Sequence, residues 1–285
     1  MTFLGEVCVG NNAPVRVMGI INVSPESFYK GSVLTRFEEI AKAAQSMEDM
    51  GASLIDIGAM STAPYLQTLI PLNRESRRMV DAVKAVKVGC NLPIVADTPR
   101  SAVAKEAIEA GADAVNDISG LKFDANMATI VADTKTPIIL GAYGGPSPHT
   151  SWQISATKKF LQESLAISRQ AKIAENKVII DPSIGFFRNE GKNPFFTKIQ
   201  GAEFYIRDIE AILNLTKLKN FQKPICVSVS RKSFIGHLLN SKTEDRLVAS
   251  IVAEIKSVKN GANIIRTHDV SQTIHGLMMA EILDC

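Results

Sequence analysis

Short apolar runs rich in β-branched residues alternate along the chain with longer amphipathic stretches. Runs of this kind that end abruptly in polar residues are typical of strands buried on both faces, whose carboxyl ends reach solvent. The pattern predicts eight strands, at residues 16–22, 53–59, 93–98, 114–119, 137–142, 178–183, 224–230 and 263–268. Consecutive strands begin mostly about 20 to 45 residues apart, which leaves room for a helix between them.

The stretches between the strands carry apolar residues at helical spacing. They predict helices at residues 37–50, 74–88, 102–110, 157–174, 202–213 and 247–259. Gly51, Gly89, Gly111 and Gly261 stand where a left-handed residue often ends a helix. Three of these glycines begin a Gly-Ala pair directly before the next strand, which indicates a repeated strand-helix unit.

Strict alternation of strands and helices favours parallel strands joined by right-handed crossovers. Eight such units close into a (β/α)8 TIM barrel, an α/β fold that usually needs about 250 residues. We therefore expect residues 1–285 to form a single barrel domain. The alternative is an open doubly wound sheet, but the segment Asn22-Val-Ser-Pro-Glu-Ser27 after the first strand lacks the G-x-G-x-x-G pattern of a dinucleotide-binding sheet.

Composition narrows the classes of function. The chain is 46% hydrophobic and 21% charged, and its net charge of +3, without a run of five basic residues, argues against a nucleic-acid partner. The four cysteines are far apart and indicate neither a zinc site nor a disulfide framework. Because the chain has neither an apolar run of 18 residues nor a signal-peptide pattern at its start, we expect a cytoplasmic protein with no membrane partner.

Polar residues at the predicted strand ends carry the candidate chemistry, because a barrel builds its active site at the carboxyl ends of its strands. Asp97 ends one strand, Asn116 and Asp117 end the next, and Asp181 ends another. A helix cap or a turn would explain Asp97 or Asp181, but burying Asn116 and Asp117 unpaired would cost on the order of a few kcal/mol. Such groups could hydrogen-bond a flat heterocycle that carries several N–H donors.

Two basic clusters indicate an anion site at the same rim. The run Ser230-Arg-Lys-Ser233 follows the seventh predicted strand, where backbone N–H groups and hydroxyls at a helix start bind anions. Arg266 and His268 are two residues apart on the eighth strand, so their side chains point to the same face. A histidine at a strand end is by itself more often structural, but with Arg266 and with Asn22 on the neighbouring first strand it could clamp a diphosphate.

The motifs at these strand ends resemble those of the dihydropteroate synthase family along nearly the whole chain. The resemblance rests on seven phrases in the same order, Met18-Gly-Ile-Ile-Asn-Val-Ser-Pro-Glu-Ser-Phe28, Gly51-Ala-Ser-Leu-Ile-Asp-Ile-Gly58 with Ser61-Thr-Ala-Pro64, Ala96-Asp-Thr98, Gly111-Ala-Asp-Ala-Val-Asn-Asp-Ile-Ser-Gly120, Ile180-Asp-Pro-Ser-Ile-Gly-Phe186, Val229-Ser-Arg-Lys-Ser-Phe-Ile-Gly236 and Arg266-Thr-His-Asp-Val270. One such phrase would be weak evidence, whereas seven in order are strong.

The resemblance implies an enzyme that joins 6-hydroxymethyl-7,8-dihydropterin diphosphate to an aryl amine and releases pyrophosphate with the help of Mg²⁺. The residues implied for the pterin ring are Asp97, Asn116, Asp181 and Lys232. Those implied for the diphosphate are Asn22, Thr62, Arg266 and His268, with Asn22 also a ligand of the metal. Phe186, Pro64 and Ser233 would face the acceptor amine. Asp97, Lys232, Arg266 and His268 would act in catalysis, and proteins of this kind are usually homodimers.

The chain departs from the family pattern in the loops that meet the acceptor. Lys30 stands where the family usually has an acidic residue, and Ala63, followed by Pro64 and Tyr65, stands where it usually has arginine. The fifth strand also lacks the family's Met-His-Met. We therefore expect either 4-aminobenzoate or an amine with added negative charge, such as the 4-(ribofuranosyl)aminobenzene 5'-phosphate of methanopterin biosynthesis, which Lys30 would meet as an acceptor-binding residue. Glu26 could replace the missing acid.

Two alternatives belong to other classes of function. A pterin-binding methyltransferase would share the Asp-Asn-Asp pterin site and pass a methyl group to a cobalt corrinoid, but it would need no diphosphate clamp. The motifs around Asn22, Lys232 and Arg266 argue against it. A non-catalytic pterin-binding homologue is the other alternative, with activity lost through Lys30 and Ala63.

Overall fold

The computed structural model describes residues 1–10, 12–25 and 33–284. Within this part of the chain, eight parallel strands form one sheet in the order β11-β12-β3-β4-β5-β6-β7-β8. Their bounds are β3 Arg16–Asn22, β4 Leu54–Gly58, β5 Ile94–Asp97, β6 Ala114–Asp117, β7 Ile138–Gly141, β8 Val178–Asp181, β11 Cys226–Val227 and β12 Ile264–Thr267. A single bridge between Ile180 and Ile225 joins β8 to β11 and closes the sheet, so the predicted (β/α)8 barrel is confirmed.

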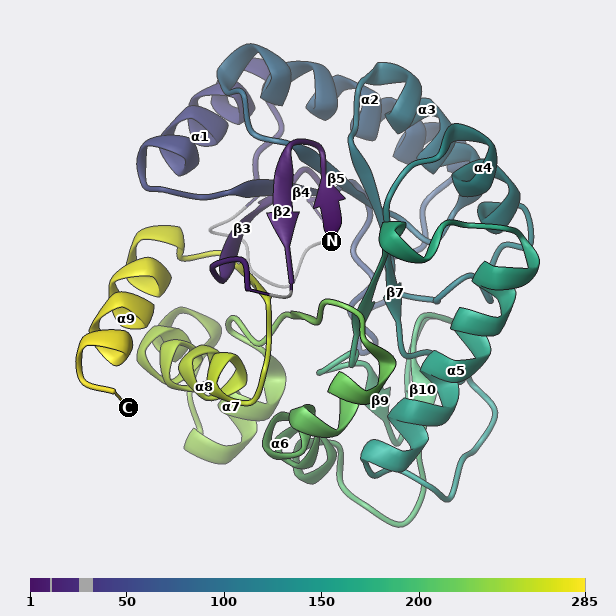
Figure 1. Ribbon diagram of the computed structural model, residues 1–285, viewed down its shortest axis with the longest axis vertical. Coiled ribbons are helices and arrows are strands. Elements are labelled where there is room, and N and C mark those ends of the chain that lie inside the picture. The colour runs from purple at the N-terminus through teal and green to yellow at the C-terminus, as the bar shows by residue number, and fades with distance from the viewer. Residues whose placement is uncertain (11, 26–32, 285) are drawn as a thin grey trace.

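Helices surround the barrel and connect consecutive strands (Figure 1). They are α1 Phe37–Asp49, α2 Leu72–Gly89, α3 Ser101–Ala110, α4 Met127–Thr134, α5 Ile154–Gln170, α6 Phe204–Leu213, α7 Ser233–Leu239, α8 Leu247–Lys259 and α9 Val270–Ile282, with short 3-10 segments at Glu175–Lys177, Leu215–Phe221 and Thr243–Arg246. Among the described residues no helix is long and apolar enough to cross a membrane.

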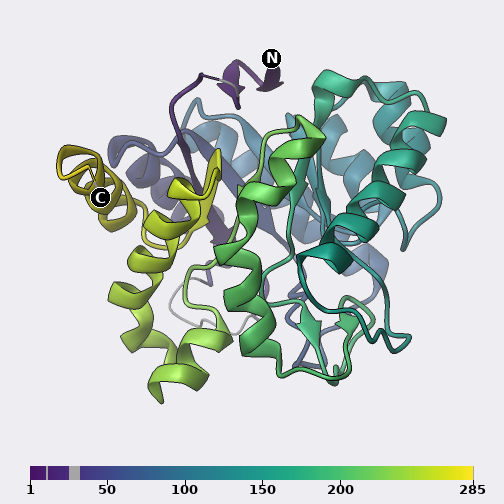
Figure 2. The same ribbon diagram turned by 60° about the horizontal axis from the view of Figure 1, so that its bottom comes forward.

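An N-terminal hairpin of β1 (Thr2–Leu4) and β2 (Val7–Val9) covers one end of the barrel, and the sequence pattern did not predict it. Its Leu4 and Val9 pack against the apolar side chains that fill the barrel interior at this end, such as Met18 and Ile264. Figure 2 places the hairpin at the end opposite to the short strands β9 (Phe187–Arg188) and β10 (Thr197–Lys198). The hairpin thereby covers the apolar end of the barrel, and the polar side chains predicted for the site belong to the opposite end.

Three of the four glycines predicted to end helices do so. Gly51, Gly111 and Gly261 have positive φ angles of 92°, 111° and 105° and lead directly into the next strand. The prediction for Gly89 is wrong, because this residue is the last of α2. A Cβ atom on Gly89 would lie 2.1 Å from the carbonyl oxygen of Ala41, so a glycine is needed here to let α1 and α2 approach.

Candidate active site

A network of charged and amide side chains fills the barrel interior at the carboxyl ends of its strands. Arg266 on β12 donates from Nε and Nη2 to Oδ2 of Asp56 on β4, at 2.8 and 2.6 Å. The same Nη2 lies 2.6 Å from Oδ2 of Asp97 on β5. Asn116 on β6 donates from Nδ2 to the other oxygen of Asp56 at 3.1 Å. Four strands distant in sequence therefore contribute to one polar layer.

Burial and mutual charge set the protonation of this layer. Burial raises the pKa of Asp97, while the neighbouring Arg266 opposes that shift. Burial alone would lower the pKa of Arg266, but Asp56 and Asp97 together raise it far above its ordinary value. The guanidinium therefore stays charged, and its Nη2 lies between two carboxylates. We expect a ligand that enters here to meet acceptors already aligned by Arg266.

The turn after β8 orients Asp181. Oδ1 of Asp181 accepts a hydrogen bond of 2.6 Å from the backbone N–H of Ser183. The fully buried Arg207 of α6 donates to the carbonyl oxygen of Pro182 at 2.7 Å, which ties this turn to the helix behind it. Burial raises the pKa of Asp181, and Lys232 is among the cations that oppose the shift. The carboxyl group is thus held at the rim by the local backbone.

Lys232 immediately precedes α7, and its Nζ lies 4.5 Å from the centre of the Phe186 ring. Burial and the nearby Arg266 together lower the pKa of Lys232 to about 8, although Asp181 opposes the shift. A lysine with this pKa is an efficient proton donor near neutral pH. Gly185, whose φ is 88°, lies close to Lys232, and its lack of a side chain leaves space for the aliphatic part of the lysine side chain.

His268 lies at the end of β12 and is held by Ser230. The backbone N–H of His268 donates to Ser230 Oγ at 3.2 Å, and the same Oγ lies 3.0 Å from Nδ1 of the ring. In the tautomer in which the Ser230 hydroxyl donates to Nδ1, the ring carries its proton on Nε2 and can donate from there. Burial and the nearby Arg266 lower the pKa of His268 to about 3. The ring is therefore neutral at physiological pH and can donate without adding a charge.

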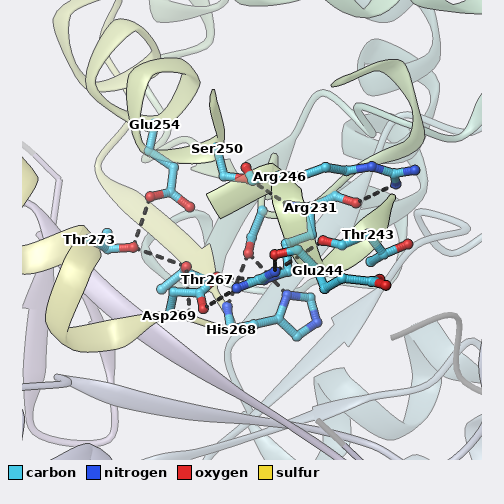
Figure 3. Close-up of polar contacts among 11 residues, drawn as sticks. Arg231, Thr243, Glu244, Arg246, Ser250, Glu254, Thr267, His268, Asp269 and Thr273 are labelled. Carbon is cyan, nitrogen blue, oxygen red and sulfur yellow. Dashed lines mark hydrogen bonds and ion pairs between the residues drawn. The ribbon is translucent and has the colours of Figure 1, made fainter. Parts of the chain in front are cut away.

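Arg231, the cation between Ser230 and Lys232, does not reach the site. Its Nε and Nη2 each lie 2.8 Å from an oxygen of Asp269, and Nη1 donates to the carbonyl oxygens of Thr243 and Glu244 (Figure 3). Arg231 thus joins β11, β12 and the segment before α8. Among the described residues Asp269 balances its charge, so these contacts give Arg231 a structural role, and its contribution to an anion site stays a prediction.

Asp117 likewise points away from the site. Its Oδ1 accepts from the backbone N–H and the hydroxyl of Ser119, and its Oδ2 accepts from the backbone N–H of Leu121 at 2.7 Å. Successive residues of a strand face opposite sides. Asn116 therefore points into the barrel while Asp117 stabilises the following turn, and the local polar partners satisfy its burial.

A single cavity lies over the polar layer. It is lined by nine of the residues that the sequence predicts for the site, Asn22, Thr62, Pro64, Asp97, Phe186, Lys232, Ser233, Arg266 and His268. Asn116 and Asp181 are not among its lining residues. Lys30 lies outside the described residues, so the structure says nothing of its position.

Two residues of the site were not singled out from the sequence. Asp56 interrupts an apolar strand on the same face as Leu54 and Gly58, a pattern that could have identified it. Arg188 lines the cavity and carries no comparable signal, and beside it lies Tyr65, which the sequence places among the departures from the family pattern. Ala63 is buried and its carbonyl oxygen accepts from Asn193 Nδ2 at 2.7 Å. Ala63 also lines the cavity.

Known proteins are similar to this chain in sequence and in fold. Residues 18–268 match the family described as pterin binding enzyme. The dihydropteroate synthase of Clostridium beijerinckii is 31% identical over 268 residues, which cover 94% of this chain and 93% of that protein.

Solved structures agree with that assignment. A dihydropteroate synthase of Xanthomonas albilineans with 4-aminobenzoic acid is 28% identical, with a TM-score of 0.82 over 95% of this chain and 94% of that one. A dihydropteroate synthase of Coxiella burnetii in complex with pteroic acid is 31% identical, with a TM-score of 0.79 over 95% of this chain and 93% of that one. The family resemblance in the sequence is confirmed, and the chain belongs to the dihydropteroate synthase family of pterin-binding transferases.

Proposed function

We propose that the protein condenses 6-hydroxymethyl-7,8-dihydropterin diphosphate with an aryl amine and releases pyrophosphate. The observation that carries the proposal is the convergence of Asp56, Asp97, Asn116 and Arg266 in one layer below a cavity lined by Lys232 and His268. Related dihydropteroate synthases have been solved with pteroic acid and with 4-aminobenzoic acid. These two ligands correspond to the joined product and to the acceptor.

The pterin half of the reaction would use the buried layer. A pterin ring presents ring N–H and amino donors on one edge and a carbonyl oxygen beside them. Asp97, Asn116 and Asp181 would accept from the donors, and Lys232 would donate to the acceptor. Their geometry supports this role, because Arg266 holds Asp97 while the Ser183 N–H holds Asp181. Fixed groups bind a rigid heterocycle without losing further side-chain entropy.

The diphosphate would lie between Asn22, Thr62, Arg266 and His268 at the cavity wall. The described residues contain no cluster of three or more His, Cys, Asp or Glu side chains arranged for a metal. Mg²⁺ needs no such cluster, since it binds through oxygen atoms and often takes most of its ligands from substrate phosphates and water. The side-chain oxygen of Asn22 fits that donor set. When bound, Mg²⁺ would neutralise charge on the leaving diphosphate.

The reaction would begin with cleavage of the C–O bond between the pterin methylene carbon and the diphosphate, which departs with the bonding electrons. The developing cation is delocalised into the ring, and the carboxylates of Asp97 and Asp56 would stabilise it. Arg266 and the Nε2–H of His268 would stabilise the charge on the leaving oxygens. The amine nitrogen then bonds to the methylene carbon and loses a proton. No strong base is required, which agrees with the neutral state of His268.

The identity of the acceptor amine is the more specific part of the proposal. Phe186 and Pro64 would pack against the aryl ring, and Ser233 would meet its anionic end, because all three line the cavity beside Lys232. The first acceptor to test is 4-aminobenzoate. The second is 4-(ribofuranosyl)aminobenzene 5'-phosphate, which the basic character of this wall supports through Arg188.

The test measures pyrophosphate release from the pterin diphosphate with each amine, with Mg²⁺ and again after chelation. We expect turnover with at least one amine, and loss of turnover on chelation. Calorimetry with the pterin diphosphate distinguishes the alternatives. Tight binding without turnover would indicate a non-catalytic homologue, and methyl transfer from a methylated pterin to a corrinoid would indicate the methyltransferase. Absence of pterin binding would refute all three.

We also propose a homodimer in the cytoplasm. Exposed apolar side chains gather on α8 and α9, where Val248, Val252, Met278, Met279 and Ile282 are each more than half exposed. Such side chains are a suitable surface for a second copy of the chain. Light scattering after gel filtration measures the mass directly. Substituting Val252 and Ile282 with lysine should halve it, and a wild-type monomer would disprove the dimer.

A further inference from the structure

Arg188 is a buried cation at the cavity wall that forms no salt bridge among the described residues, although Asp208 lies close enough to favour its charged form. It lies on β9, with only 6% of its surface exposed, and lines the same cavity as Lys232. Its Nε donates to the carbonyl oxygen of Gly185 at 3.0 Å. Its Nη2 donates to the hydroxyl of Ser233. Both hydrogen-bond partners are neutral, so only the more distant Asp208 offsets the charge of the guanidinium.

Other buried arginines of the described chain are paired with acids. Arg207 lies 3.4 Å from Asp208, Arg231 lies 2.8 Å from Asp269, and Arg266 contacts two aspartates. A buried charge without a counter-ion is costly, and proteins rarely keep one that has no ligand to meet. Arg188 differs from these arginines because its acid, Asp208, acts only at longer range, which indicates that an anion completes the site.

Aromatic side chains hold the Arg188 guanidinium in place. Its central carbon lies 4.0 Å from the centre of the Phe204 ring and 5.7 Å from that of Tyr65. Stacking on aromatic faces orients arginine for bidentate binding of carboxylate or phosphate, a geometry that lysine does not provide. The cation is thus prepared for a planar anion before any ligand arrives.

The segment that carries Arg188 is attached to the loop that carries Tyr65. Asn193 Nδ2 donates to the carbonyl oxygens of Ala63 and Leu66, at 2.7 and 3.1 Å, and the backbone N–H of Lys192 donates to that of Pro64 at 2.7 Å. These bonds join residues about 130 positions apart in the sequence. They hold Tyr65 opposite Arg188 and set the width of the cavity between them.

From these contacts we infer that Arg188, together with Ser233, binds the anionic end of the aryl amine and selects for acceptors that carry one. The inference rests on the proposed function and adds the residue that determines acceptor choice. The shared chemistry is a carboxylate or phosphate on the side of the aryl ring opposite the amine. Arg188 would form the charged contact, and the Ser233 hydroxyl, already bonded to Arg188, would form the second.

Arg188→Gln tests the inference by its effect on KM. We expect KM for 4-aminobenzoate to rise about 10- to 100-fold, the effect of removing a charge-assisted hydrogen bond. KM for the pterin diphosphate and the kcat/KM for aniline, which has no anion, should stay within about twofold of wild type. A phosphonate analogue, 4-aminobenzylphosphonate, forms the second arm. The acceptor whose KM rises more in Arg188→Gln carries the anion that the site prefers.

Two control variants separate charge from structure. Arg188→Lys keeps the charge and should recover part of the affinity. Lys192→Gln removes an exposed cation of the same segment that contributes only its backbone N–H, and should leave both KM values unchanged. Equal losses with aniline and 4-aminobenzoate would show that Arg188 is structural and would overturn the inference.

Failure of the proposed function would look different. In that case the wild-type protein would release no pyrophosphate with any amine. Calorimetric titration of amines into the wild-type protein with bound pterin then decides the inference without turnover. A preference for 4-aminobenzoate over aniline that Arg188→Gln abolishes supports it, and equal affinity for the two amines overturns it.

Discussion

Glu254 is a buried carboxyl group whose loss of a proton should make the fold less stable as the pH rises. It lies on α8 with 1% of its surface exposed, and Oε2 accepts a hydrogen bond of 2.8 Å from Thr273 (Figure 3). Its Oε1 is buried without a hydrogen-bond partner. Burial raises the pKa of Glu254 to about 7 from an ordinary 4.5, and Asp269 adds to the shift.

The sign and size of the effect follow from these two values. The unfolded chain releases the proton of Glu254 near pH 4.5, whereas the folded protein retains it to about pH 7. Between these limits the folded state binds more protons, so its stability falls as the pH rises and then becomes constant. The difference in pKa corresponds to about 3 kcal/mol, of which about 2 kcal/mol is lost between pH 5 and pH 8.

Glu254→Gln removes this titration and keeps an acceptor for Thr273. The free energy of unfolding, measured in urea by circular dichroism, should therefore improve relative to wild type by about 2 kcal/mol between pH 5 and pH 8. Other buried acids titrate in both proteins and cancel in the difference. Glu281→Gln on the exposed face of α9 is the matched control and should keep the pH dependence of wild type. A constant difference between Glu254→Gln and wild type at every pH would refute the reasoning.

Three further predictions concern the site and its frame. Asp56→Asn removes the carboxylate that Arg266 contacts twice, and should lower kcat/KM at least 100-fold and the free energy of unfolding by about 3 kcal/mol. Unchanged turnover would contradict this prediction. Gly89→Ala places a methyl group against Ala41 and should cost about 2 kcal/mol in thermal unfolding; an unchanged melting temperature would show that the helices can move apart. Since the pKa of Lys232 is lowered to about 8, pterin affinity measured by calorimetry should fall about tenfold from pH 7 to pH 9, and Lys232→Arg should remove that dependence.

The barrel was predictable because its evidence is local. Each strand is an apolar run with a polar end, and each of the helix stops at Gly51, Gly111 and Gly261 has the φ angle that only glycine adopts readily. The convergence of Asp97, Asn116 and Arg266 follows from the topology alone, because parallel strands of a barrel place their ends on one rim. The strand predicted at 224–230 shrinks to Cys226–Val227, since the chain turns early to position Lys232.

The acceptor side was not predictable in the same way. Arg188 carries no periodic or motif signal, and its role depends on the segment folding back onto a loop near Ala63. A contact across about 130 residues has no local signature. Asp56 was a different case, since a carboxylate within an apolar strand was visible in the sequence.

Among the described residues a single bridge, between Ile180 and Ile225, joins β8 to β11, so this junction is the weakest in the barrel sheet. Asp181 lies on one side of the junction and Lys232 on the other, so separation of the two strands would also separate two groups proposed to hold the pterin. A pterin bound to both residues would hold the two strands together. Amide hydrogens of β8 and β11 should therefore exchange faster than those of β3 and β4, and slow most when the ligand binds. The site would then contribute to the closure of the barrel that builds it.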